Sequence, residues 1–210
     1  KNTGLSVSGI LIDSVYGTPI NKGVVVVRKG THTPTLLKPN LLSADSSVYA
    51  GFVRSDGRYN INVEDSTYYF VQGYSDYFLP TYYNNQNATS VFWQNADSVF
   101  INQTTANKNL YLERDSSYGG GGAYGSITLP FLEAQELDGI TVLAKSITNN
   151  HLYSYNFGKE DGEFNINNLP YGSYQLVAQK VGYPNAVSEI FTISPQNQSQ
   201  YNLNIQFTLT

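Results

Sequence analysis

Apolar and polar residues alternate along most of the chain, and helical spacing is almost absent. The last ten residues show the pattern best, because every second side chain is apolar and the others are Asn, Gln or Thr. The apolar members of this segment are Tyr201, Leu203, Ile205, Phe207 and Leu209. A period of two is typical of a strand with one buried face. Residues 23–27 are mostly Val, which indicates a strand buried on both faces. We therefore expect an all-β protein.

The pattern occurs twice along the chain. Segments 55–77 and 160–183 both contain Asp-Gly-x-aromatic-Asn-Ile-Asn, and both reach a Gly-Tyr pair, at Gly73-Tyr74 and Gly182-Tyr183. Residues 5–13, 23–30 and 107–114 likewise match 123–131, 139–146 and the last ten residues. Four consecutive glycines lie between the two copies, which is typical of a flexible linker. The sequence thus predicts a domain at 1–115, a Gly-rich linker at 116–124 and a domain at 125–210.

Turn residues punctuate the second copy. Asp161-Gly162 is a hairpin turn pair, because Gly supplies the positive φ that a tight turn needs, and Asp56-Gly57 matches it in the first copy. Pro170 and Gly172 predict the return turn. The alternation then predicts four side chains that face inward from paired strands. They are Phe164, Ile166, Tyr174 and Leu176.

The second copy resembles the carboxypeptidase regulatory-like domain, of the transthyretin-like and collagen-adhesin B-type superfamily. The matching residues are Gly139, Val142, Asp161, Gly162, Phe164, Ile166, Leu169, Pro170, Gly172, Tyr174, Leu176, Gly182 and Tyr183. The first copy lacks the Leu-Pro-x-Gly turn and carries an insertion at 31–47. The resemblance implies a tandem of two Ig-like, transthyretin-like antiparallel Greek-key β-sandwiches. It also implies a secreted or surface setting, in which such domains serve as stalks, adhesin spacers and enzyme appendages.

Some relatives of this kind join a Lys on the first strand to an Asn on the last strand by an isopeptide bond. The segments that match the first strand, 5–13 and 123–131, contain no Lys. We therefore expect no such bond in this chain.

Composition narrows the class of protein. Only 13% of residues are charged, the formal net charge is -4, and 18 residues are Tyr. An acidic chain of this kind argues against a nucleic-acid partner, which needs a basic face. No apolar run approaches the roughly 20 residues of a membrane helix. Because Met is absent, we interpret the chain as mature after removal of a signal segment. Cys is also absent, so no disulfide is possible. The extracellular or cell-surface location is what the resemblance implies.

Candidate chemistry is sparse. His32 and His151 are the only histidines, and each sits in a turn or loop with no nucleophile motif nearby. The acidic clusters are Glu133, Glu136 and Asp138, and Glu160, Asp161 and Glu163. We interpret both clusters as solvated turns, with a calcium site as the alternative. The sequence predicts a protein that is not an enzyme and needs no cofactor.

Aromatic residues suggest a contact surface. The stretch 78–93 holds Tyr82, Tyr83, Phe92 and Trp93, the only Trp. These rings suit the core of the first domain, a protein interface or a sugar, and the sequence leaves the three open.

The two terminal strands are the other candidates. Leu5 and Val7 lie in one, and Leu203, Ile205 and Phe207 in the other. Either strand completes its own domain or pairs with the edge of a neighbouring subunit.

Possible glycosylation sites are of two kinds. Asn87, Asn102 and Asn197 lie in N-glycosylation sequons, which also arise by chance in an Asn-rich chain. Ser14, Ser66 and Ser98 follow Asp and precede Val or Thr, a pattern similar to O-glycosylation sites of some secreted bacterial proteins.

Two functions fit these observations. The first is a non-enzymatic extracellular structural protein that self-assembles into a surface filament or stalk through edge strands and aromatic contacts. The alternative is a carbohydrate-binding or tethering appendage of a larger secreted hydrolase, with glycans as partners.

Overall fold

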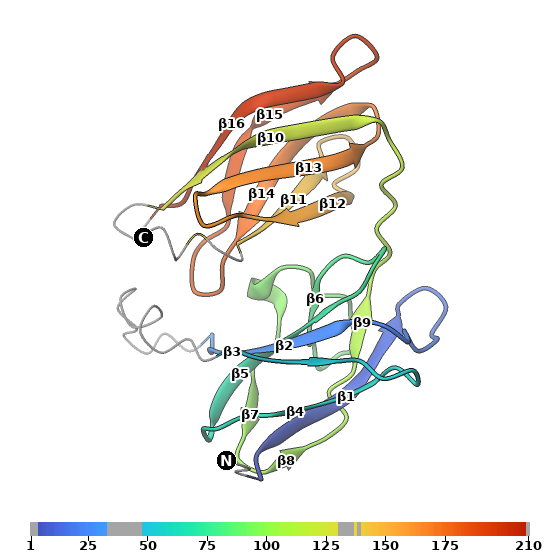
Figure 1. The fold of residues 1–210 in the computed structure, drawn as a ribbon, viewed down its shortest axis with the longest axis vertical. Helices are drawn as coiled ribbons and strands as arrows, with labels where there is room; N and C mark the ends of the chain where they lie inside the picture. Colours follow the sequence, from blue (N-terminus) through green and yellow to red (C-terminus); the bar gives the residue numbers. More distant parts are fainter. Residues whose placement is uncertain (1–3, 33–47, 130–136, 138–139, 209–210) are drawn as a thin grey trace. The chain divides into compact units, whose positions relative to one another are not determined.

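The protein is all-β and divides into two compact units (Figure 1). The computed structural model describes residues 4–32, 48–129, 137 and 140–208. Unit 1 is Lys1–Arg114 and unit 2 is Asp115–Thr210. No helix in the described part of the chain is long and apolar enough to cross a membrane.

The described residues of unit 2 form a sandwich of seven strands in two sheets. Its strands are β10 (Gly121–Thr128), β11 (Thr141–Ser146), β12 (Leu152–Phe157), β13 (Glu163–Leu169), β14 (Gly172–Gln179), β15 (Ala186–Ile193) and β16 (Ser199–Gln206). The small sheet has the order β13-β10-β16, and the large sheet has the order β12-β11-β14-β15.

Unit 1 repeats this strand order. Its strands are β1 (Ser6–Asp13), β2 (Val24–Lys29), β3 (Val48–Phe52), β4 (Arg58–Asn62), β5 (Thr67–Tyr74), β6 (Thr81–Tyr82), β7 (Val99–Ile101), β8 (Thr104–Thr105) and β9 (Leu110–Leu112). The small sheet joins β4, β1 and β8, with β9 also paired to β1, and the large sheet joins β3, β2, β5 and β6, with β7 also paired to β5. The internal repeat seen in the sequence is therefore also a repeat of topology.

The first strand of each unit pairs with the last strand in parallel. β1 runs parallel to β8 and β9, and β10 runs parallel to β16, whereas the other pairs are antiparallel. The resemblance implied purely antiparallel sheets, and the parallel pairing of the first and last strands corrects this expectation. Its physical reason is that the chain enters and leaves each small sheet in the same direction, which a local hairpin cannot do.

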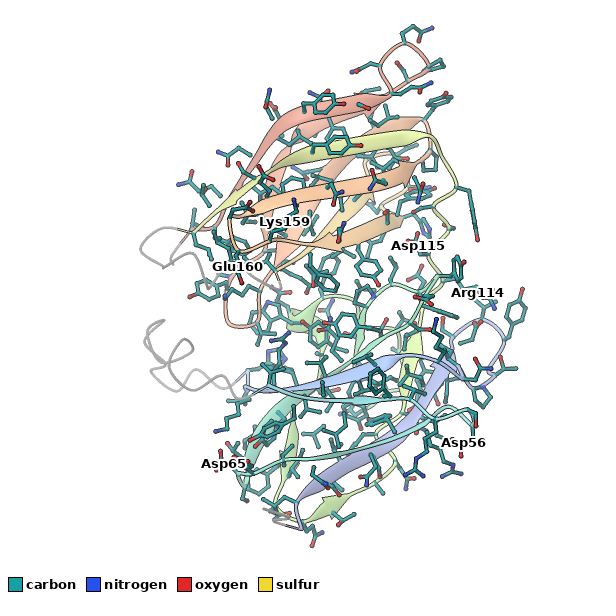
Figure 2. The ribbon with its side chains drawn as sticks, in the orientation of Figure 1. Asp56, Asp65, Arg114, Asp115, Lys159 and Glu160 are labelled. Carbon is teal, nitrogen blue, oxygen red and sulfur yellow. The ribbon has the colours of Figure 1, made fainter. Side chains whose placement is uncertain are left out.

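The Asp-Gly turns are tight but connect different sheets. Gly57 and Gly162 have φ of 81° and 82°, and Figure 2 labels Asp56 and Glu160 in the two turns. Each turn leads from a large-sheet strand to a small-sheet strand, so it is not a hairpin of paired strands.

The same correction applies to the turn at Pro170. Phe164 and Ile166 on β13 and Tyr174 and Leu176 on β14 are buried as predicted, but the two strands belong to different sheets and do not pair. The Tyr174 hydroxyl donates a hydrogen bond to the Pro170 carbonyl over 2.9 Å, which stabilises the turn that leads from β13 in one sheet to β14 in the other.

The Gly-Tyr match between the two copies is displaced by several residues. Tyr74 pairs with the first residue of β2, and Gln179 pairs with the first residue of β11, so these two positions correspond. The turn that follows ends at Phe78 in one unit and at Tyr183 in the other, each with its N–H bonded to the carbonyl three residues earlier. Gly182-Tyr183 therefore corresponds to Tyr77-Phe78, and Tyr77 has a φ of 67° where unit 2 has glycine.

The segment expected as a linker is bonded to unit 2. Asp115, the residue before the expected linker, belongs to unit 2 and accepts hydrogen bonds from the N–H groups of Ser117 and Ser154, over 3.0 and 3.1 Å. Gly119 donates to the Asn168 carbonyl over 2.9 Å, and β10 already begins at Gly121. Composition predicted a flexible connector because glycine has no side chain to pack, but backbone groups of this segment are satisfied by unit 2.

A matching pair of glycines lets the last strand approach the first in each unit. Gly9 lies opposite Tyr59 and Gly125 lies opposite Phe164 in the strand register. A Cβ at Gly125 would lie 1.9 Å from the Leu203 carbonyl oxygen, and a Cβ at Gly9 would lie 2.2 Å from that of Lys108. Neither position has room for a side chain unless the strands separate.

We expect Gly125→Ala to lower the unfolding free energy of unit 2 by roughly 2 kcal/mol or more, because the parallel strand pair must widen. Gly120→Ala is the matched control, since a Cβ at Gly120 meets no atom within 4 Å. Urea unfolding followed by circular dichroism measures both. Equal midpoints for Gly125→Ala and Gly120→Ala would contradict the close approach.

Candidate contact surfaces

The aromatic stretch of unit 1 packs mainly against its own unit. Tyr82 and Tyr83 are buried, and burial raises the pKa of Tyr82. Trp93 is half-buried, with its ring stacked on His32 at 5.4 Å and edge-on to Phe70 at 6.0 Å between centroids. A short 3-10 helix spans Trp93–Asn95, and Phe92, the residue before it, is also half-buried. Of the three alternatives that the sequence left open, these contacts support core packing for Tyr82 and Tyr83.

His32 takes part in this cluster. Its ring is edge-on to Phe70 at 5.0 Å, and its Nε2 lies 2.6 Å from the Ala96 carbonyl oxygen. The sequence placed His32 in a loop with no nucleophile motif nearby. The side chain is exposed, yet these contacts give it a structural role over Trp93 and Phe70.

The candidate residues of the terminal strands are core residues. Val7, Leu203, Ile205 and Phe207 are each 1% exposed or less, and only Leu5 is half-buried. The strand β16 pairs with β10 along its length. Contact through these side chains would require the strand to leave its own sheet.

Tyr201 breaks the alternation that the sequence predicted. It was placed on the same face as Leu203, but its side chain is 60% exposed. The register between β10 and β16 shifts after Ala123, where β16 contains one extra residue, and Asn202 has a φ of 58°. A bulge of this kind turns the following side chains to the opposite face. Asn in a strand, a residue that tolerates positive φ, was the available signal.

Sequence reasoning also missed most of the exposed rings. Among the described residues, six aromatic side chains are more than half exposed: Tyr16, Phe52, Tyr77, Tyr118, Tyr171 and Tyr201. They are scattered over loops, strand ends and one bulge, so no periodic pattern marks them. Aromatic residues in polar segments were the only sequence signal.

The glycosylation candidates are mostly accessible. Asn87, Asn102 and Asn197 are exposed, as are Ser14 and Ser66, whereas Ser98 is half-buried. A sugar can be attached only to a side chain that an enzyme can reach, so Ser98 is the least suited of the six.

The acidic clusters form no metal site in the described part of the chain, where no three His, Cys, Asp or Glu side chains converge. Glu133, Glu136 and Asp138 lie outside the described residues. Glu160, Asp161 and Glu163 lie around the turn between β12 and β13, where Lys159 approaches Glu163 at 3.4 Å. His151 approaches the Ser116 hydroxyl at 2.9 Å.

One buried carboxylate organises the end of unit 1. Asp13 accepts hydrogen bonds from Arg114 Nε at 2.8 Å and from the Val15 N–H at 2.9 Å, and its side chain is 3% exposed. The Arg114 guanidinium also lies 4.8 Å from the Tyr16 ring centroid and 5.5 Å from that of Phe78. Burial alone would raise the pKa of Asp13, but the hydrogen bonds from Arg114, Val15 and Tyr16 outweigh it and lower the pKa.

Comparison with protein families finds no family model that matches the chain, and comparison with curated proteins finds no match. The superfamily resemblance therefore stays a resemblance.

Among solved structures, a minor pilin of Streptococcus agalactiae aligns with 98% of this chain and 97% of its own, at 13% identity and a TM-score of 0.31. The shaft pilin SpaA of Lactobacillus rhamnosus GG aligns over 98% of both chains, at 12% identity and a TM-score of 0.32. The TIE protein of Bacillus anthracis aligns with 97% of this chain but only 34% of its own, at 9% identity and a TM-score of 0.33. TM-scores this low carry no argument about function, which has to be argued from the residues themselves.

We expect Asp13→Asn to lower the unfolding free energy of unit 1 by about 1–2 kcal/mol at neutral pH, because a charge-assisted pair is lost. A lowered pKa means that the contribution of Asp13 is complete above its ordinary value of 3.8 and is lost as the pH falls below it. The difference between wild type and Asp13→Asn should therefore shrink on acidification. Denaturant unfolding at several pH values measures it.

Asp76→Asn is the control, because Asp76 pairs with Lys22 through side chains that are 66% and 80% exposed. An exposed pair of this kind contributes little to stability. A stability difference for Asp13→Asn that stays constant down to pH 2 would contradict the role given to the ionised carboxylate.

Proposed function

We propose that the chain is a non-catalytic, extracellular structural protein whose copies assemble into a surface filament or stalk. The observation that carries this proposal is the set of exposed rings on a charge-poor surface. In the part of the chain that the structure describes, six aromatic side chains are more than half exposed, while only 13% of all residues are charged. Protein interfaces are enriched in Tyr and Phe and depleted of Lys, Glu and Asp at their centres. Low charge also weakens the repulsion that keeps proteins monomeric.

The contacts between copies are made by folded units in this proposal. Leu203, Ile205 and Phe207 complete the core of unit 2, and burying one side chain of this size contributes about 1.5–3 kcal/mol. Exchange of β16 between copies would have to break and remake all of these contacts. Docking through exposed side chains requires no such opening, so it is the route that we favour.

Purified protein at high concentration should form fibres of regular repeat under negative-stain electron microscopy. The reason is that contacts between different patches of neighbouring copies do not close, and they propagate into a filament. Sedimentation of the same sample gives the assembled fraction. Monodisperse particles at every concentration and salt condition would contradict the proposal that copies assemble into a filament.

A disulfide across the terminal strand separates docking from strand exchange. Thr128 and Gln206 are exposed partners in the β10–β16 register, and neighbouring strands place such partners within disulfide reach. The chain has no Cys of its own, so Thr128→Cys with Gln206→Cys forms a single bond. We expect the oxidised protein to assemble as well as the reduced protein. Assembly only after reduction would show that β16 is exchanged.

Glycosylation is part of this proposal at the exposed sites. We expect intact protein from its native source to be heavier than its sequence by whole sugar units, with peptide mapping that places the sugars at Ser14, Ser66 or the exposed sequons. These side chains are accessible and Ser98 is less so. A native mass equal to the sequence mass would remove this part of the proposal and leave the structural role intact.

A further inference from the structure

The outer face of the small sheet in unit 2 has an unusual composition. We define the β10–β16 face as the outward side chains of these two strands. They are Tyr124, Ser126, Thr128, Tyr201, Asn202, Asn204 and Gln206. None of these side chains is charged. All can form hydrogen bonds, and the two tyrosines add apolar area. The third strand of the sheet, β13, places Glu163 opposite Ser126 at one edge of this face, where Glu163 pairs with Lys159 at 3.4 Å.

The two tyrosines of this face form a stacked pair. Their ring centroids are 5.0 Å apart and their planes differ by 15°. The Tyr124 hydroxyl donates to the Asn167 side-chain oxygen over 3.2 Å, and Tyr201 is 60% exposed. The bulge at Asn202 turns Tyr201 onto this face. The rings are thus held in place while much of Tyr201 stays in water.

Unit 1 shows that the fold does not need these rings. Gly9 and Gly125 are corresponding positions, so Ser8 corresponds to Tyr124. The last strand of unit 1 also has one extra residue before Leu110, with Asn107 at a φ of 61°. Asn107 therefore corresponds to Asn202, and the residue before it, Ala106, corresponds to Tyr201. The same fold with the same bulge forms with Ser and Ala at these two positions.

We infer that the β10–β16 face binds a second copy of this chain, with the Tyr124–Tyr201 pair at its centre. The inference rests on the proposed self-assembly and assigns a surface to it. Each copy carries a net charge of -4, so copies approach one another with least repulsion through an uncharged face. Surfaces that bind proteins are often rich in Tyr, Ser and Asn. Tyr supplies rigid aromatic contact area, and Ser and Asn supply adaptable hydrogen bonds around it.

The choice of a protein partner follows from the stacking. Each of the two rings covers one face of the other, so less open ring surface is left for a sugar. Ring edges, hydroxyls and amides stay available for a protein surface. Amide and hydroxyl groups both donate and accept, so this face can form hydrogen bonds with a different patch on the neighbouring copy, as a contact that propagates requires.

The test replaces the pair by its unit 1 counterparts, Tyr124→Ser with Tyr201→Ala, in the full chain. We expect the critical concentration for assembly, measured by sedimentation, to rise at least about tenfold, because a central aromatic anchor is lost. The thermal unfolding midpoint should change little. Tyr118→Ser is the matched control, since Tyr118 is 83% exposed in unit 2 but lies outside this face, and it should assemble like wild type.

Each other outcome has a defined meaning. If wild type and the double variant assemble at the same concentration, the face is not a contact, while the proposed filament role stands. If wild type never assembles, both proposals fall. If the double variant unfolds early, Tyr201→Ala alone repeats the test with Tyr124 kept. If the variants assemble normally but lose retention on insoluble cellulose, the partner is a neutral glycan and the inference is wrong.

Discussion

The parallel pairing of the first strand with the last strand is the contact on which each unit depends. In unit 2 it brings β16 against β10, and in unit 1 it brings β8 and β9 against β1. The pairing is possible because Gly9 and Gly125 leave room for the carbonyl oxygens of Lys108 and Leu203. It ties the end of each unit to its beginning, and it places the side chains of the final strand in the core.

This constraint decides where contacts with other molecules can arise. Because Leu203, Ile205 and Phe207 are buried in the core of unit 2, the inner face of the terminal strand is not available to another molecule. What remains available is the outer face of the same strand. The extra residue at the bulge puts Tyr201 there in unit 2 and Ala106 there in unit 1, so two units with one fold present different surfaces.

The repeat was visible in the sequence, but its exact correspondence was not. Asp-Gly and Asn-Ile-Asn align correctly because tight turns and alternation impose local rules. The Gly-Tyr pairs aligned wrongly, because Gly182 corresponds to Tyr77 and not to Gly73. Both Gly182 and Tyr77 have a positive φ, so a glycine is not required at this position and does not mark it in both units. Composition predicts a flexible linker at 116–124, but it does not reveal that Gly119 donates to the Asn168 carbonyl or that β10 begins at Gly121.

The sequence by itself determined the all-β class, the duplication and which side chains of a strand face inward, such as Phe164 and Ile166. It could do so because alternation and turn preferences depend only on residues that are close in the sequence. The tertiary structure alone decided which strands pair, since a short turn can join strands of one sheet or of two. It also decided that Tyr201 faces water, because a single extra residue in a strand reverses every side chain beyond it. The candidate contact surface depends on that reversal, and periodicity alone cannot reveal it.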